Sequence, residues 1–67
     1  MRDLVKTRKG HVLIDTRYMN YGWESVLFKA DGAGNVVDYG RLDTRSYGSL
    51  EEAQAGHKEI VERWSKK

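Results

Sequence analysis

The chain has 67 residues, one third of them charged, with a formal net charge of +2 and no cysteine. A chain of this length forms one domain at most and buries only about 60% of the surface of its unfolded form, so self-association is the expected aid to a marginal core. Without cysteine, disulfides and thiolate metal sites are excluded. With only two histidines, no structural zinc site, metal site or other cofactor is expected.

From its apolar pattern, the chain is expected to carry no membrane span or export signal. No apolar run approaches the 18 or so residues of a transmembrane helix, and the N-terminus lacks the apolar core of a signal peptide. A cytoplasmic location is therefore expected. Residues 1–10 hold four basic side chains against one acidic one and are predicted to form a flexible basic arm, or an anion-binding arm, before a single small domain at residues 11–67.

Three segments have the pattern of β-strands. In residues 11–19 apolar and β-branched side chains alternate with polar ones, which favours a strand. Asn20 and Gly22 suit a turn that needs positive φ, before a second strand at residues 23–30. The glycine-rich stretch that follows is typical of a hairpin tip, and the returning strand begins at Val36.

The next stretch, residues 42–48, has two interpretations. It extends the third strand past a bulge at Gly40, or it forms a short fourth strand. Ser49 then begins a helix, with Glu52 three residues later to complete a capping box. The sequence thus predicts an α+β fold: a three- to four-stranded antiparallel sheet, arranged as a meander or hairpin, with one C-terminal amphipathic helix packed on one face.

The helix presents a continuous apolar stripe at helical period, made up of Ala53, Gly56, His57, Ile60, Val61 and Trp64. Glycine costs a helix about 1 kcal/mol relative to alanine, so we interpret Gly56 as a packing device that lets a large ring from the sheet approach the helix. Candidate rings are Trp23, Tyr39 and Phe28. On the outer side, Glu59–Arg63 and Glu62–Lys66 are expected ion pairs.

His57 lies at the edge of this stripe. The structural interpretation is a half-buried histidine with one ring nitrogen bonded to a carbonyl or hydroxyl of the sheet. The functional interpretation is a general base or ligand, but the sequence signals no partner for it. Glu24, Asp38 and Asp43 have no spacing that supports a carboxylate pair, so no catalytic residue is predicted and the chain is not expected to be an enzyme.

One helix covers only one face of a sheet, yet both faces of the central hairpin carry apolar residues. Val26 and Phe28 point one way, and Trp23, Leu27 and Tyr39 are expected to point the other. One of these two sets packs against the helix, and the pattern alone leaves open which one. The other set is left exposed, and an uncovered apolar face usually marks an interface. A symmetric homodimer through the sheet is therefore expected.

The segment from Trp23 to Trp64 resembles a family of small uncharacterised proteins of tailed bacteriophages. The resemblance rests on the strand Trp23-Glu24-Ser25-Val26-Leu27-Phe28 and on the run from Tyr47 to His57 with its Ala-x-x-Gly-His pattern. At the third and fourth positions of this strand the family has threonine and methionine, whereas this chain has Ser25 and Val26. The resemblance covers about two thirds of the chain and implies a phage protein that acts in the cytoplasm of an infected bacterium, with no activity to carry over.

Two binding functions follow as hypotheses. The first is a non-enzymatic protein-interaction module, a modulator of a host bacterial factor or defence system, because aromatic side chains dominate interface hot spots. Its predicted surface consists of Tyr18, Tyr21, Trp23, Leu27 and Tyr39. The alternative is a nucleic-acid-binding module in which sheet aromatics stack on bases and arginines contact phosphates, with Arg17, Arg41, Arg45 and Tyr47 as its residues. Three interleaved aspartates weaken the field of those arginines.

Overall fold

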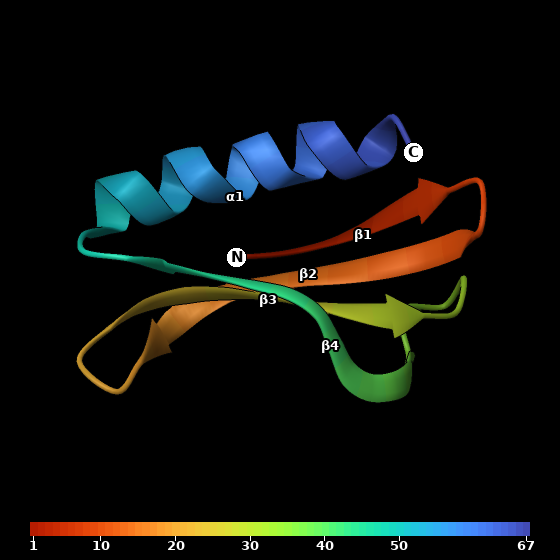
Figure 1. Cartoon of the computed structure of the whole chain (residues 1–67), viewed down its shortest axis with the longest axis horizontal. Coiled ribbons are helices and arrows are strands. Elements are labelled where there is room, and N and C mark those ends of the chain that lie inside the picture. Colours follow the sequence, from red (N-terminus) through yellow and green to blue (C-terminus); the bar gives the residue numbers. More distant parts are fainter.

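The computed structural model describes residues 1–67 as one sheet and one helix. The strands are β1 (Arg2–Thr7), β2 (Gly10–Met19), β3 (Gly22–Ala30) and β4 (Val36–Tyr47), and the helix is α1 (Leu50–Ser65). The four strands form an antiparallel meander in the order β1-β2-β3-β4. Figure 1 shows α1 along one side of this sheet, in contact with every strand. The predicted α+β fold is confirmed.

The N-terminal segment is ordered, which corrects the prediction of a flexible arm. Residues 2–7 form β1, which pairs with β2 along its whole length. The Met1 amino group donates to the Thr16 carbonyl at 2.8 Å, and the Thr16 N–H donates back to the Met1 carbonyl at 2.8 Å. Only Val5 in this strand is buried. Because the other side chains of β1 remain exposed at the edge of the sheet, the sequence shows little of the alternation that marks a strand.

The β2–β3 connection is a two-residue turn with an unusual occupant. Asn20 and Tyr21 have φ angles of +48° and +72°, the pattern of a type I′ turn, which suits the twist of a hairpin. The sequence predicts positive φ at Asn20 and Gly22, and the second of these predictions is wrong: Gly22 already belongs to β3, and the positive φ falls at Tyr21. A bulky side chain in the left-handed region is uncommon, because its Cβ crowds the backbone.

The β3–β4 connection is held by Asp31. Its Oδ1 accepts hydrogen bonds from the N–H groups of Ala33 and Asn35, both at 2.9 Å. These bonds, that from Asn35 above all, hold the pKa of the Asp31 carboxyl below its ordinary value, because they favour the ionised form. The resulting stabilisation is present above the unfolded-state pKa and is lost as the pH falls through the lower folded-state pKa.

The stretch at residues 42–48 continues the third predicted strand. β4 runs without a break from Val36 to Tyr47, and its pairing with β3 shifts register between Leu27 and Ala30. The shifts act as bulges, which bend a strand and re-aim its side chains. They carry Tyr39 to the side of the sheet on which Phe28 lies, where the two rings meet edge to face at 5.9 Å. The expectation that Tyr39 shares a face with Trp23 and Leu27 is therefore wrong.

α1 begins as its sequence predicts. The Ser49 side chain accepts a hydrogen bond from the Glu52 N–H at 3.1 Å, and acidic residues occupy the first turn. Of the two expected ion pairs on the outer side, Arg63 and Glu59 meet at 2.7 Å. Glu62 and Lys66 form none, so Lys66 is left without a carboxylate partner.

The core lies between the helix and one face of the sheet. It consists of Val5, Val12, Ile14, Leu27 and Ile60, with Val61 and Trp64 packed against it. Burial of each large apolar side chain contributes about 1.5–3 kcal/mol. The face that meets the helix is thus the one that carries Leu27. The outer face carries Leu13, Val26 and Phe28.

No helix of the structure has the length and apolar character to cross a membrane.

Candidate functional site

The centre of the helix–sheet interface is built around Gly56. A Cβ atom at this position would lie 2.6 Å from both Cζ and Oη of Tyr47, and closer still to Cε1. The Tyr47 ring therefore occupies the space that a side chain at position 56 would need. Gly56 is confirmed as a packing device, but the ring that it admits is that of Tyr47, not of Trp23, Tyr39 or Phe28.

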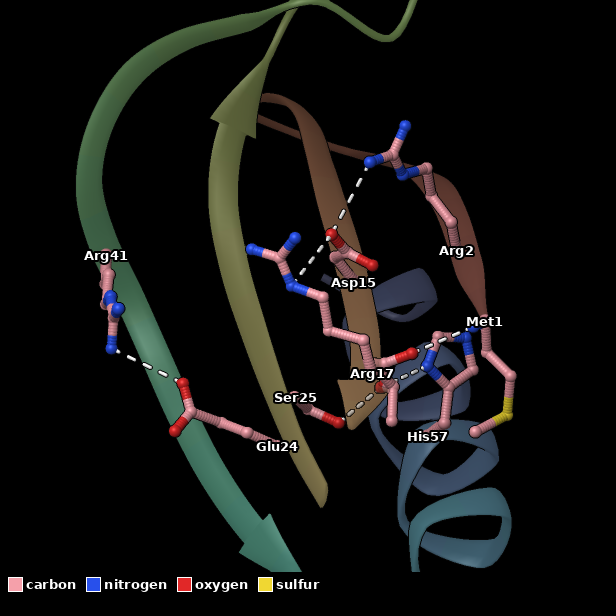
Figure 2. A network of polar contacts seen from close by, with 9 residues as sticks. Met1, Arg2, Asp15, Arg17, Glu24, Ser25, Arg41 and His57 are labelled. Carbon is pink, nitrogen blue, oxygen red and sulfur yellow. Dashed lines mark hydrogen bonds and ion pairs between the residues drawn. The ribbon is translucent and has the colours of Figure 1, made fainter. Parts of the chain in front are cut away.

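His57 begins a chain of buried polar groups. Its Nε2 lies 2.7 Å from Asp3 Oδ2, and its Nδ1 lies 2.6 Å from Thr16 Oγ1. Thr16 Oγ1 in turn bonds to Ser25 Oγ, which lies 2.9 Å from Tyr47 Oη. Four of the five side chains are buried, and only that of Asp3 reaches solvent. Figure 2 shows His57 on α1 and Ser25 on β3, with dashed lines running from each toward β2. The group between them is the Thr16 hydroxyl.

The neutral tautomer of His57 that carries its proton on Nε2 satisfies every member of the chain. Nε2–H then donates to Asp3, while Nδ1 accepts from the Thr16 hydroxyl. The Thr16 hydroxyl accepts from Ser25, and Ser25 accepts from Tyr47. Each hydroxyl donates once and accepts where a donor is offered, and no buried side-chain polar atom lacks a partner. The structural interpretation of His57 is thereby confirmed in its main feature: one ring nitrogen bonds to a hydroxyl of the sheet.

The connectivity of carboxylate, imidazole and hydroxyl is also that of a nucleophilic triad. In such a triad the hydroxyl must reach a substrate. Thr16 and Ser25, however, are 0% exposed, because the helix covers one side and β-strands flank the other. A substrate would reach neither oxygen without undocking α1. The arrangement is suited to fixing the helix on the sheet rather than to attacking a bound molecule.

Three of the five residues predicted to bind a partner come together at the β2–β3 turn. Tyr18 and Trp23 are cross-strand partners, and their rings meet edge to face at 5.7 Å. Tyr21 projects from the turn beside them. Tyr21 is 99% exposed and Tyr18 is 61% exposed, while Trp23 is half-buried. We call these three residues the aromatic patch.

The other two predicted residues lie elsewhere. Leu27 is 1% exposed in the core, so it presents no surface to a partner. Tyr39 is 77% exposed, but it lies against Phe28 on the outer face of the sheet. There Leu4, Leu13 and Phe28 are cross-strand neighbours. Together with Tyr39 they form an apolar row across all four strands, the outer row. Leu13 is itself buried in this row, so the outer face is less bare than the sequence suggests.

The residues of the alternative nucleic-acid surface are engaged within the protein. Arg17 pairs with Asp15, Arg41 with Glu24 and Arg45 with Glu59, at distances of 3.2–3.8 Å. Figure 2 shows the first two of these pairs. Tyr47 is buried against Gly56 and offers no ring face to a base. The carboxylates thus offset the positive charge that phosphates would require at these positions.

Sequence reasoning did not identify Asp3, Thr16 and Ser25 as partners of His57. The available signal is positional. Thr16 continues the inward-facing series of Val12 and Ile14, and Ser25 precedes Leu27 by two residues. A polar side chain at an inward position of a strand requires a buried hydrogen-bond partner, and His57 on the apolar stripe is such a partner. Asp3 carries no comparable signal, because its strand is not recognisable.

The fold places the chain in the class of small α+β proteins that consist of an antiparallel meander and a single helix. No family model, curated protein or solved structure matches the chain.

Proposed function

We propose that the chain is a non-enzymatic protein-interaction module that binds its partner through the aromatic patch. The observation that carries this proposal is Tyr21, which adopts a left-handed φ and yet is almost wholly exposed. The backbone strain of such a residue costs about 1–3 kcal/mol and concentrates at functional positions. Tyr21 packs against no core that would offset this cost. Tyrosine and tryptophan are enriched at binding hot spots, and Tyr18 and Trp23 adjoin it.

The origin implied by the resemblance completes this proposal. In a phage protein, the partner is a bacterial protein of the infected cell, and the module modulates a host factor or defence system from the cytoplasm. The closed polar chain of His57 is consistent with a protein that acts by binding, because its hydroxyls are out of reach of substrates.

Tyr21→Gly separates binding from folding. It creates an Asn-Gly turn, the favoured type I′ sequence, and removes the strain, partly offset by the flexibility of glycine in the unfolded chain. We expect the free energy of unfolding to rise by about 1 kcal/mol and the melting temperature by about 4–8 °C. In nuclease-treated bacterial lysate, a protein retained by the wild-type chain is expected to be lost by Tyr21→Gly. Circular dichroism and quantitative pull-down measure the two effects.

The matched control for this experiment is Tyr39→Ala, which removes another exposed ring at a distance from the aromatic patch. It is expected to retain the captured protein. Titration of that protein, once purified, should give a Kd at least tenfold weaker for Tyr21→Gly than for the control. Equal binding by Tyr21→Gly and the wild-type chain would remove the basis for the proposal, since the variant is the more stable of the two.

The outer row supports the proposal of a homodimer. Beside its exposed members, the same face carries charged side chains of both signs, among which Asp15 contacts both Arg2 and Arg17. A twofold axis would place apolar row on apolar row and let carboxylates meet guanidinium groups of the partner.

Light scattering tests the homodimer directly. The expected molar mass is twice the 7.7 kDa of one chain and changes little with salt, because the apolar row supplies most of the contact. Tyr39→Asp is expected to give a monomer, since it places a charge in the outer row, whereas Tyr18→Asp leaves the dimer intact. A monomeric wild-type chain at about 100 µM, where an interface of standard size is well populated, would exclude this dimer.

A further inference from the structure

The basic side chains of the protein are divided unevenly between its two ends. The β1–β2 turn lies near the C-terminal end of α1 (Figure 1). Side chains of these two segments line two adjoining clefts. Six of the 12 lysines and arginines line them, namely Lys6, Arg8, Lys9, Lys29, Lys66 and Lys67. None of the 10 acidic residues does so. The side chains that line the two clefts therefore carry a formal charge of +6, whereas the other side chains comprise six basic and ten acidic ones.

These six cations are also free of carboxylate partners. The basic partner in every ion pair of the protein is His57 or an arginine that lies outside the two clefts. These arginines are Arg2, Arg17, Arg41, Arg45 and Arg63. The negative end of the helix dipole lies nearby and amounts to about half a charge, which the six cations outweigh. Because these cations form no ion pair, none has to be broken before they neutralise an anion, so the site is available to one.

The larger cleft combines this charge with an aromatic wall. It has a volume of about 580 Å³ and is lined by Trp64 together with Val12, Leu42 and His11. Trp64 is half-buried, which fixes its ring, and Lys67 Nζ lies 4.8 Å from the ring centroid. The Arg8 N–H donates to the Lys67 carbonyl at 3.1 Å and holds the two segments of the cleft together. The smaller cleft has no hydrophobic lining and shares Thr7, Arg8 and Lys67 with the larger one.

We propose that these two clefts form a binding site for single-stranded nucleic acid, with a base stacked in the larger cleft against Trp64 and the phosphates of the adjoining nucleotides among the lysines. An aromatic platform joined to a positive groove is the common arrangement of sequence-tolerant single-strand binding. Lysine ammonium groups bind phosphates as point charges without a fixed orientation. The site is separate from the aromatic patch and from the paired arginines of β2 and β4.

Fluorescence anisotropy with a labelled ten-nucleotide oligothymidylate tests this site. With roughly four phosphates contacted, Kd is expected to rise about 50-fold between 50 and 200 mM salt. Lys9→Glu/Lys67→Glu is expected to weaken binding at least tenfold. Arg41→Glu/Arg45→Glu changes the net charge by the same amount and should leave binding within threefold. Equal losses in the two double variants would show that net charge, not the cleft, governs binding, and would overturn the proposal.

The aromatic wall is tested separately in a Trp23→Phe background, where Trp64 is the only tryptophan. Its fluorescence is expected to be quenched on binding, which a purely structural Trp64 would not show. Trp64→Leu should weaken binding about tenfold, and Trp64→Phe should restore most of it. Unchanged fluorescence at saturation overturns the stacking. Binding of a ten-residue polyglutamate, or of a duplex of equal length, as tightly as the oligothymidylate overturns the assignment to single strands.

Discussion

Gly56→Ala is expected to lower the free energy of unfolding by about 2–3 kcal/mol, although alanine is the better helix former. The new methyl group would fall within the Tyr47 ring, and this ring cannot turn aside without losing the hydrogen bond from its hydroxyl to Ser25. Overpacking costs about 1–3 kcal/mol, and an unpaired buried polar group costs a similar amount. The gain of about 1 kcal/mol in helix propensity offsets only part of this. Urea unfolding measures the difference.

Two controls separate the contact from the propensity. Ala55→Gly changes the exposed neighbouring position in the opposite direction and should cost about 1 kcal/mol. Tyr47→Ala removes the ring, so a further Gly56→Ala in that background should be neutral or stabilising. If Gly56→Ala stabilises the wild-type chain by about 1 kcal/mol, the helix does not approach β4 as closely as the structure shows.

Thr16→Val is expected to cost about 2–3 kcal/mol, because Thr16 is the central member of the buried polar chain. Valine has nearly the same shape but offers no hydroxyl. His57 Nδ1 would lose its donor and the Ser25 hydroxyl would lose its acceptor, both in a site closed to water. Each buried group left unpaired costs about 1–3 kcal/mol. A domain of this size has a total stability of roughly 3–10 kcal/mol, so the loss is a large fraction of it.

Thr16→Ser is the matched control for this substitution. It keeps the hydroxyl and removes one methyl group, at an expected cost of about 1 kcal/mol. Chemical denaturation of the two variants therefore ranks Thr16→Val below Thr16→Ser. The opposite ranking would indicate that the methyl group, rather than the polar chain, supplies the stabilisation at this position.

The features of the helix were predictable because their signals are local. Ser49 and Glu52 lie three residues apart, and the stripe that contains Gly56 and His57 repeats within one element. Each property depends on neighbours along the chain, so the cap, the helix and the buried position of Gly56 could be predicted. The identity of the ring at Gly56 could not, because it depends on how far β4 extends.

The predictions that were wrong or missing concern features that depend on contacts between residues far apart in the sequence. β1 is defined by its hydrogen bonds to β2, not by an apolar pattern of its own, and without β1 the bond from Asp3 to His57 cannot be anticipated. The face on which Tyr39 lies depends on register shifts in β4, which leave no mark in composition. The basic clefts likewise join Lys6, Arg8 and Lys9, from the basic arm predicted at residues 1–10, to Lys66 and Lys67 at the opposite end of the chain. The sequence therefore showed only half of this cluster of six cations.

The members of the buried polar chain lie far apart in the sequence, and this separation also sets the order in which the elements of the fold assemble. The meander joins each strand to the next, so its pairing can proceed locally, whereas His57 lies 41 residues from Thr16 and 54 from Asp3. Contacts at such separations form late, since the loop between them must close first. On the ribosome, α1 emerges after the four strands, and until it docks against them Thr16 and Ser25 remain hydrated.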